Sequence, residues 1–375
     1  MPIRSSHRAA APFAALSIAA LMIGALPARA APAEPTYAVS GKIAGPDGGW
    51  DYVSFDPAHR RLYVSRGDGV LALDVDTGVV TPHLADGKRT HETLVLAGGD
   101  TLLVTNGASG TALVINVADG KQIGEIPTGP APDAAALETG TNLAVVVSAV
   151  GVATVIDPTS KAVVASIPVG GKLEFLAGDG HGHMFVNVES KNEIAVLDLK
   201  TRSVTARYKL DGCESPGGLA YDPKAGVLIA ACDNGVAKVV AARTGAVVAT
   251  LKIGKGPDAV IFDPVRGLAF IPCGGDGVLD VIKVGNGRDA LLIQVANTER
   301  GARTGMVDPK TGALYLPAAT YGPPPPAGGA LLFERGYIWK AEAGGDILCE
   351  VVAYRGASRY DAGVRLSRVI RKPGR

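Results

Sequence analysis

The sequence lacks the short motifs that mark most cofactor-dependent and nucleophilic enzymes. It contains no Cys-x-x-Cys-His for haem attachment, no His-Glu-x-x-His for zinc, no phosphate-binding glycine loop ending in Lys-Ser/Thr, and no Gly-x-Ser-x-Gly. The groups of any active site would therefore have to come together from distant parts of the chain.

The chain also lacks an excess of charge of either sign. It has 37 Lys and Arg against 36 Asp and Glu, and the first thirty residues hold three arginines and no acid, which leaves 34 basic residues in the remainder. A near-neutral total argues against the broad phosphate-neutralising surface that tight nucleic-acid binding needs.

The beginning of the chain differs from the rest. Arg4 and Arg8 precede an uncharged, alanine-rich stretch at 9–26, which is followed by Ala-Arg-Ala at 28–30. This order is typical of a secretory signal peptide, so residues 1–30 are predicted to be removed and the mature protein to be periplasmic or secreted, with no membrane span. The alternative is a retained anchor, although the apolar core is short for a spanning helix. No cysteine follows the cleavage site, so a lipid anchor is not indicated.

Turn residues and short apolar runs are abundant. The 49 glycines and 25 prolines separate runs of Val, Leu, Ile and Ala, which is typical of a strand-and-turn chain. One apolar segment recurs at a period of roughly forty-one residues, in the range of four-stranded propeller blades. Its seven copies are Leu62–Val64, Leu102–Val104, Leu143–Val145, Met184–Val186, Val227–Ile229, Leu268–Phe270 and Leu314–Leu316.

The repeat predicts an all-β fold, a seven-bladed β-propeller with four-stranded blades over residues 31–330. A blade cannot bury both of its faces alone, so its strands stay apolar on both sides and stack on neighbouring blades. The extended segment Tyr37–Ala44 precedes blade one and is predicted to be the outermost strand of blade seven, which would close the ring. The alternative is a disordered start of the mature chain.

Blade seven is the least determined part of this prediction. Residues 331–375 hold nine basic and five acidic residues without a clear turn pattern, and Ile347–Tyr354 is the only strand expected there. This atypical basic segment either completes blade seven by another route or is a divergent tail.

Two stretches resemble a known family. Leu103–Asn106, continued through Ala112–Asn116, resembles the YVTN repeat of the YncE-like bacterial propellers. Residues 300–304, 308–311 and 314–317 resemble the seventh-blade signature of exported members of that group. The resemblance covers residues 36 to about 326 and implies a seven-bladed periplasmic propeller. It brings no agreed catalytic site.

Acidic residues recur at the start of the predicted innermost strands. In a propeller such positions lie at equal height around the channel mouth, so five carboxylates would face one axis and favour a cation between them. Oxygen ligands suit Ca²⁺ or Mg²⁺, which are the candidate cofactors. The alternative is that each carboxylate caps backbone N–H groups. The seven positions are Asp51, Glu92, Asp133, Glu174, Gly217, Asp258 and Arg303, the first four spaced 41 apart.

Basic residues interrupt this acidic ring. Arg303 occupies the position in blade seven, and Arg89, His91 and Arg300 lie in inter-blade turns expected on the same face. An acidic ring with a basic flank suits a polar or zwitterionic ligand, while simple surface solvation is the alternative.

Four cysteines suggest one disulfide. Cys213 precedes the first strand of blade five and Cys232 ends the second, so the two return to the same face of a hairpin. An exported compartment permits the bond, which would contribute roughly 3 kcal/mol by loop closure. Cys273 is a competing partner one blade later and Cys349 lies in the tail. Free thiols are the alternative.

These observations favour a non-catalytic, monomeric protein that binds a small ligand or an envelope protein through the channel-mouth face. One alternative is a metal-dependent lactonase-like hydrolase, in which a channel-mouth cation polarises a carbonyl and Asp258 or Glu174 serves as base. Another is a structural or cell-envelope interaction protein that uses the blade edges or the basic tail.

Overall fold

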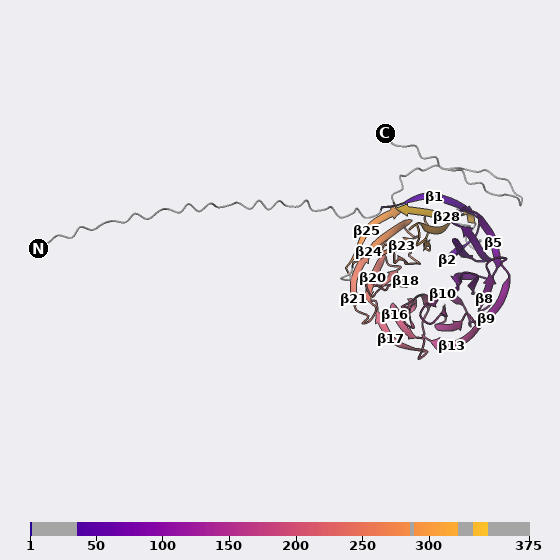
Figure 1. The fold of residues 1–375 in the computed structure, drawn as a ribbon, viewed down its shortest axis with the longest axis horizontal. Coiled ribbons are helices and arrows are strands. Elements are labelled where there is room, and N and C mark those ends of the chain that lie inside the picture. The colour runs from indigo at the N-terminus through magenta and orange to yellow at the C-terminus, as the bar shows by residue number, and fades with distance from the viewer. Residues whose placement is uncertain (2–35, 286–288, 322–332, 344–375) are drawn as a thin grey trace, which may run out of the picture. The chain divides into compact units, whose positions relative to one another are not determined.

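The structure, a computed structural model, describes residues 1, 36–285, 289–321 and 333–343. These residues form seven four-stranded antiparallel sheets around a central axis (Figure 1), which confirms the predicted seven-bladed propeller. The proposed signal peptide and the expected strand at 347–354 lie outside the described residues. Within the described ranges, no helix is long and apolar enough to cross a membrane.

Each of the first six blades runs from an innermost strand at the axis to an outermost strand on the rim (Figure 1). Blade one comprises β2 (Trp50–Asp56), β3 (Arg61–Arg66), β4 (Gly69–Asp74) and β5 (Val80–Asp86). Blade two comprises β6 (Thr90–Val95), β7 (Thr101–Asn106), β8 (Thr111–Asn116) and β9 (Gln122–Pro127). Blade three comprises β10 (Pro132–Glu138), β11 (Leu143–Ser148), β12 (Val152–Asp157) and β13 (Ala162–Pro168).

The next three blades repeat this order. Blade four comprises β14 (Leu173–Gly178), β15 (His183–Val188), the 3-10 turn η1 (Glu189–Lys191), β16 (Glu193–Asp198) and β17 (Ser203–Lys209). Blade five comprises β18 (Pro216–Asp222), β19 (Val227–Cys232), β20 (Val236–Ala241) and β21 (Val247–Lys252). Blade six comprises β22 (Ile261–Asp263), β23 (Leu268–Cys273), β24 (Val278–Val284) and β25 (Ala290–Asn297).

Burial changes across a blade from the middle strands to the rim. Every residue of β19 is buried, because both faces of a middle strand pack against neighbouring blades. The outermost strand β17 instead alternates between exposed and half-buried residues, as a strand at the rim should. The core is therefore a series of apolar layers between blades, and the innermost strands surround the central axis.

Blade seven joins the two ends of the propeller. Its strand order is β1 (Tyr37–Gly45), β28 (Phe333–Ala343), β27 (Leu314–Tyr321) and β26 (Met306–Val307). The N-terminal segment is thus the outermost strand of blade seven, as predicted. The sequence analysis did not identify β28, which lies in the basic segment after residue 330 and supplies the third strand of this blade.

Tyr37 holds β1 against blade six. Its backbone N–H donates to Oε1 of Gln294 at 2.8 Å, and Nε2 of Gln294 donates to its carbonyl at 2.6 Å. The Tyr37 ring is 1% exposed and packs edge to face on Phe270, with the ring centroids 4.8 Å apart. The side chain of Gln294 therefore pairs with β1 much as another strand would.

A second contact that closes the ring lies at the turns opposite the channel mouth. Arg60 of blade one donates two hydrogen bonds to Asp308 of blade seven, at 2.6 and 2.8 Å, and also pairs with Asp76. Asp308 also accepts from the backbone N–H of Lys310. Burial acts to raise the pKa of this carboxyl, but the hydrogen bonds from Arg60 and from the turn outweigh it and lower the pKa to about 2. In blades one, five and six the same hairpin turn also begins with an aspartate followed by proline, and Asp56, Asp222 and Asp263 accept backbone N–H groups of these turns in the same way.

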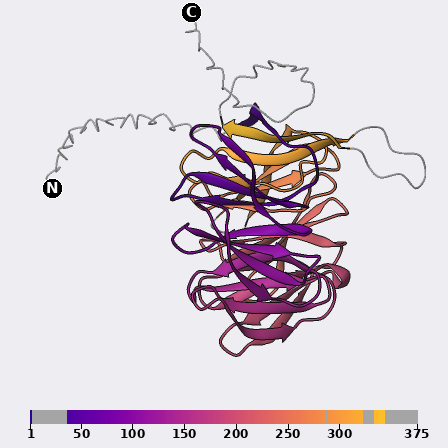
Figure 2. The ribbon, with the colours of Figure 1, turned by 90° about the vertical axis from the view of Figure 1, so that its right-hand side faces the viewer.

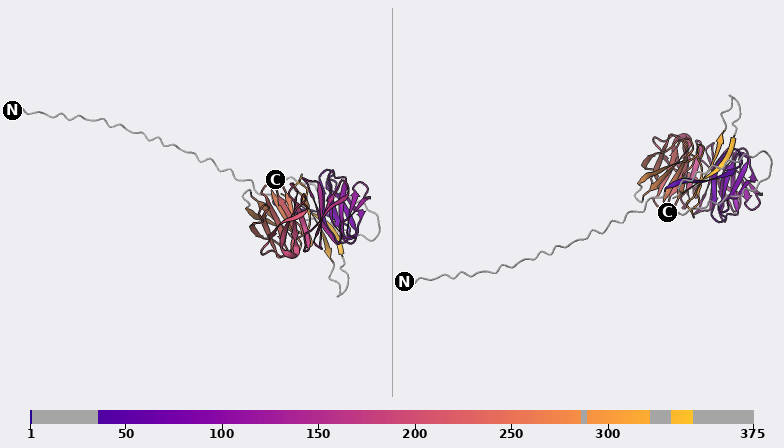
Figure 3. Two further views of the ribbon diagram at one scale, coloured as in Figure 1. Left: turned by 90° about the horizontal axis from the view of Figure 1, so that it is seen from below. Right: turned by 90° about the horizontal axis from the view of Figure 1, so that it is seen from above.

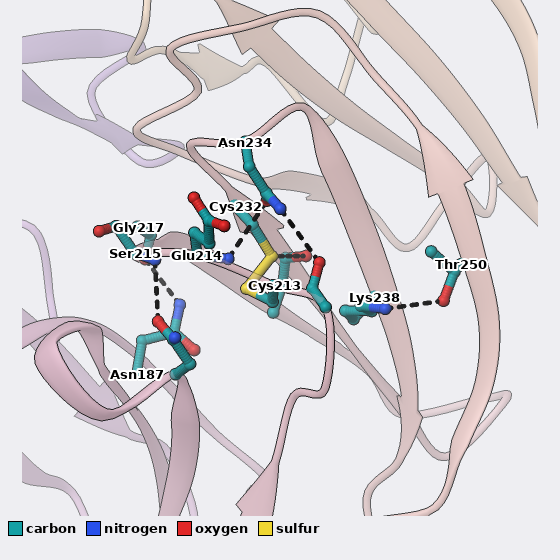
Figure 4. Close-up of a disulfide and its surroundings, with 12 residues drawn as sticks. Asn187, Cys213, Glu214, Ser215, Gly217, Cys232, Asn234, Lys238 and Thr250 are labelled. Carbon is teal, nitrogen blue, oxygen red and sulfur yellow. Dashed lines mark hydrogen bonds between the residues drawn. A yellow bond between two sulfur atoms is a disulfide. The ribbon is translucent and has the colours of Figure 1, made fainter.

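A disulfide joins Cys213 to Cys232, the favoured pair, with their Cα atoms 5.5 Å apart (Figure 4). It ties the segment before β18 to the end of β19. The Asn234 side chain reinforces this link, since it accepts from the backbone N–H of Glu214 and donates to the carbonyl of Gly212. The bond thus fixes the part of blade five that faces the channel mouth.

Cys273, the competing partner, is a buried free thiol whose Sγ lies 3.3 Å from Oδ2 of Asp280. Cys349 lies outside the described residues.

The edge-on views show a flat ring from which one strand pair extends (Figures 2 and 3). This pair is β27 and β28, coloured orange to yellow. β27 is the second strand of its blade and runs from the turn at Asp308 toward the channel mouth, so its additional residues lie on the channel-mouth side.

Candidate functional site

A cavity of about 580 Å³ opens on the channel axis, where the innermost strands begin. All seven blades contribute to its lining. Three of the lining side chains are basic: His91, Lys172 and Arg303. Six are carboxylates: Asp51, Asp133, Glu174, Glu189, Asp233 and Asp258.

The cavity includes most of the predicted ring but not Glu92. Strand pairing aligns Trp50 with Arg66 in blade one and Thr90 with Asn106 in blade two, so His91, not Glu92, is the equivalent of Asp51. The spacing from Asp51 to this position is forty residues and not forty-one. Because successive side chains in a strand point to opposite faces, a shift of one residue turns Glu92 away from the mouth.

Glu92 instead lines a second cavity, of about 130 Å³, together with apolar side chains that include Phe175 and Met306. Burial, and then the charge of Asp51, raise the pKa of Glu92 well above its usual range. Its carboxyl accepts the backbone N–H of Thr93 at 3.0 Å. For this one carboxyl, the alternative role of a backbone cap is correct.

Ion pairs connect the ring across blades. His91 Nδ1 lies 2.8 Å from Oδ2 of Asp51 and 3.8 Å from Oδ1 of Asp133. Arg303 lies 3.1 Å from Asp258 and 4.0 Å from Asp51.

Lys172 completes this pattern on the far side. Its Nζ lies 3.0 Å from Oε2 of Glu174 and also contacts Glu189. Each of the three basic side chains is therefore shared between two carboxylates.

Burial and mutual repulsion raise the pKa of several of these acids and so favour their neutral forms. Burial, followed by the charges of Asp133 and Asp258, raises the pKa of Glu174 to about 8. Burial also raises the pKa of Asp258 to about 6, against the opposing effect of Arg303. The pKa of Asp133 is raised by burial as well, although His91 opposes the shift. The basic side chains therefore do not fully offset the burial and mutual repulsion of Asp133, Glu174 and Asp258.

Tyr52 lies between the two cavities and lines both. Its side chain is 4% exposed and packs on Phe175, with the ring centroids 5.0 Å apart. The hydroxyl has no hydrogen-bond partner among the described residues. Burial, then the nearby charges of Asp258 and Glu174, raise its pKa well above the usual range.

The expected Ca²⁺ or Mg²⁺ site has no preformed ligand set. In the described ranges, no three His, Cys, Asp or Glu side chains are grouped so that they could hold a metal ion. The carboxylates lie apart around a wide cavity and pair with basic side chains, which does not match the compact oxygen shell that these ions require.

Several lining residues were missed in the sequence. Glu189 and Asp233 both directly follow a second strand, and the same repeat position holds glycine or alanine at Gly67, Gly107 and Ala149. Comparing that position across the repeats would have found the two acids. The sequence gives no such signal for Tyr52. Of the predicted basic flank, His91 and Arg303 line the cavity, and Arg89 and Arg300 are not among its lining residues.

Comparison with known proteins supports the fold class. No protein-family model and no curated protein match the chain. Among solved structures, a chain of hydrazine synthase from Kuenenia stuttgartiensis matches with a TM-score of 0.62 and 17% identity, over 78% of this chain and 96% of that one. The RRP9 WD40 repeats match with a TM-score of 0.69 and 12% identity, over 82% and 100%. A chain of the mitotic checkpoint complex matches with 0.67 and 14%, over 87% and 98%.

The protein is therefore a seven-bladed β-propeller with WD40-like structural neighbours.

Proposed function

We propose that this protein is an exported, YncE-like propeller that binds a small polar ligand in the mouth cavity without catalysing a reaction on it. The observation that carries this proposal is the cavity itself. All seven blades line it, and its volume of about 580 Å³ lies within the range of small-molecule sites.

The lining side chains are held in place by ion pairs, which supports binding over catalysis. His91 is held by Asp51 and Arg303 by Asp258, so the basic groups are engaged in fixing the shape of the cavity. The disulfide at Cys213 adds rigidity beside Ser215 and Gly217, which both line the mouth. A prearranged pocket of this kind binds a ligand with little loss of conformational entropy.

The sequence supports export and the family assignment. Residues 1–30 have the order of a signal peptide, and Leu103–Asn106 resembles the YVTN repeat. A disulfide between Cys213 and Cys232 suits an oxidising compartment.

A substitution that fills the cavity tests the proposal. Gly217 begins the inner strand of blade five at the position where other blades carry Asp51 or Asp133, so Gly217→Leu places a side chain in the mouth. The full chain is expressed with residues 1–30 intact and recovered from the periplasm as a chain that starts at Ala31. A library of charged and polar metabolites is then screened by thermal shift, and hits are measured by calorimetry.

We expect at least one ligand whose affinity falls at least about tenfold in Gly217→Leu. Thr81→Leu adds the same side chain to the exposed rim strand β5 and serves as the matched control. Ligands that bind Gly217→Leu as tightly as the control would show that the mouth is not the binding site.

A further inference from the structure

We propose that the ligand is an organic cation whose protonated amine lies above the Tyr52 hydroxyl, among Asp133, Glu174 and Asp258. This inference rests on the proposed function and names the class of ligand that the same cavity selects.

The first argument is the charge of the cavity. Its described lining holds six carboxylates but two permanently charged cations, Lys172 and Arg303, together with His91. Each cation is already shared: Lys172 contacts Glu174 and Glu189, and Arg303 contacts two aspartates. An anionic ligand would have to compete for these cations, whereas a cationic ligand meets an excess of carboxylate.

Tyr52 provides an independent observation. Tyr52 lines both cavities, and its buried hydroxyl has no hydrogen-bond partner in the part of the chain that the structure describes. A buried hydroxyl without a partner costs stability, so its environment is incomplete. A ligand ammonium would donate an N–H to this oxygen from the side where the carboxylates lie.

Three carboxyls whose charges act on Tyr52 favour a positive charge beside them. Burial raises the pKa of Asp133, and it does the same for Glu174 and Asp258 despite the basic side chains near them. A cation among the three would favour their ionised forms and convert their mutual repulsion into attraction.

The size and spacing of the site favour an amine over a metal ion. A cavity of about 580 Å³ is far larger than one ion needs, and no three possible metal-ligating side chains are grouped among the described residues. An ammonium group can instead form separate N–H bonds to well-spaced oxygens.

A matched four-carbon series tests the ligand class. Putrescine carries two ammonium groups, 4-aminobutyrate one ammonium and one carboxylate, and succinate two carboxylates. Calorimetry at pH 7.5 and low salt is expected to show tighter binding of putrescine than of 4-aminobutyrate, and the weakest binding of succinate. Spermidine extends the series with a third amine, and CaCl₂ and MgCl₂ are titrated separately.

Two variants locate the amine. Tyr52→Phe keeps the ring and removes only the unpartnered hydroxyl, so we expect stability to be retained and putrescine affinity to fall about tenfold, as for the loss of one hydrogen bond to a charged group. Asp133→Asn should weaken binding at least as much. Asp119→Asn removes the same charge from an exposed turn, where Asp119 pairs with Lys121, and is the matched control.

The outcomes separate this inference from the proposed function. Tighter binding of succinate, or of Ca²⁺ or Mg²⁺, would overturn the amine while leaving the mouth as a binding site. The amine would also be overturned if this protein bound a neutral ligand from the library but no amine. Unchanged putrescine affinity in Tyr52→Phe would overturn the placement above Tyr52. Failure of every ligand to depend on Gly217 would refute the proposed function as well.

Discussion

His91 and Glu92 are neighbours in β6 that take opposite roles. His91 pairs with Asp51 in the mouth cavity, whereas Glu92 lines the second cavity and accepts the backbone N–H of Thr93. The period of forty-one residues predicts Glu92 at the mouth, because acids recur at this spacing. The strand register instead places His91 at the mouth, because blade two begins one residue earlier than the period predicts.

The environment of Glu92 leads to a prediction at the residue scale. Since burial, and then the charge of Asp51, raise its pKa, the neutral form of the carboxyl is favoured, and Glu92→Gln should be tolerated. A raised folded pKa stabilises the protein at low pH and loses that effect as the pH rises. The stability of Glu92→Gln relative to the native protein should therefore increase between pH 5 and 9, measured by urea unfolding. A constant loss across this range would mean that the ionised carboxylate is required.

At the scale of strands, the closure of blade seven depends on β1 and β28, and only β1 has a sequence pattern that predicts a strand. β1 was predicted from its extended pattern, and β28 was not predicted. Their pairing runs from Tyr37 opposite Ala343 to Gly45 opposite Gly336. The apolar alternation of β28 is interrupted by charged residues, so only its partner strands identify it.

Tyr37 allows this closure to be tested. Tyr37→Ala removes a buried ring that packs on Phe270, and we expect a loss of about 3–5 kcal/mol in the free energy of unfolding. Tyr37→Phe is the matched control, because the hydroxyl has no hydrogen-bond partner among the described residues and its removal should cost little. Chemical denaturation of both variants decides the matter. Equal stability would mean that β1 does not hold the ring closed.

At the scale of the whole molecule, the mouth concentrates charge that the near-neutral total conceals. Glu174 and Asp258 have folded pKa values of about 8 and 6, above their usual 4.5 and 3.8. The pKa of His91 is also raised, mainly by its hydrogen bond to Asp51. For each group the stabilising contribution is complete below the unfolded pKa and lost as the pH rises through the folded value.

The ligand-free protein should therefore lose stability as the pH rises from 5 to 8.5, by at least about 1.4 kcal/mol, the free energy of one pKa unit. Glu174→Gln should flatten this profile. Asp308, with a folded pKa of about 2, shifts in the opposite direction and does not contribute in this range. Unfolding free energies in a pH series are the measurement, and stability that rises toward pH 8.5 would contradict the proposed crowding of acids.

The sequence by itself determined the repeating architecture, and it favoured the N-terminal strand of blade seven and the pairing of Cys213 with Cys232 over their alternatives. These follow from apolar periodicity and turn residues, which act within one blade or between adjacent strands. Only the tertiary structure decided that His91 replaces Glu92, that Tyr52 lies between two cavities, and that Lys172 joins two acids. The reason is that the cavity forms between blades, where a change of one residue in spacing reverses the direction of a side chain while leaving the periodicity intact.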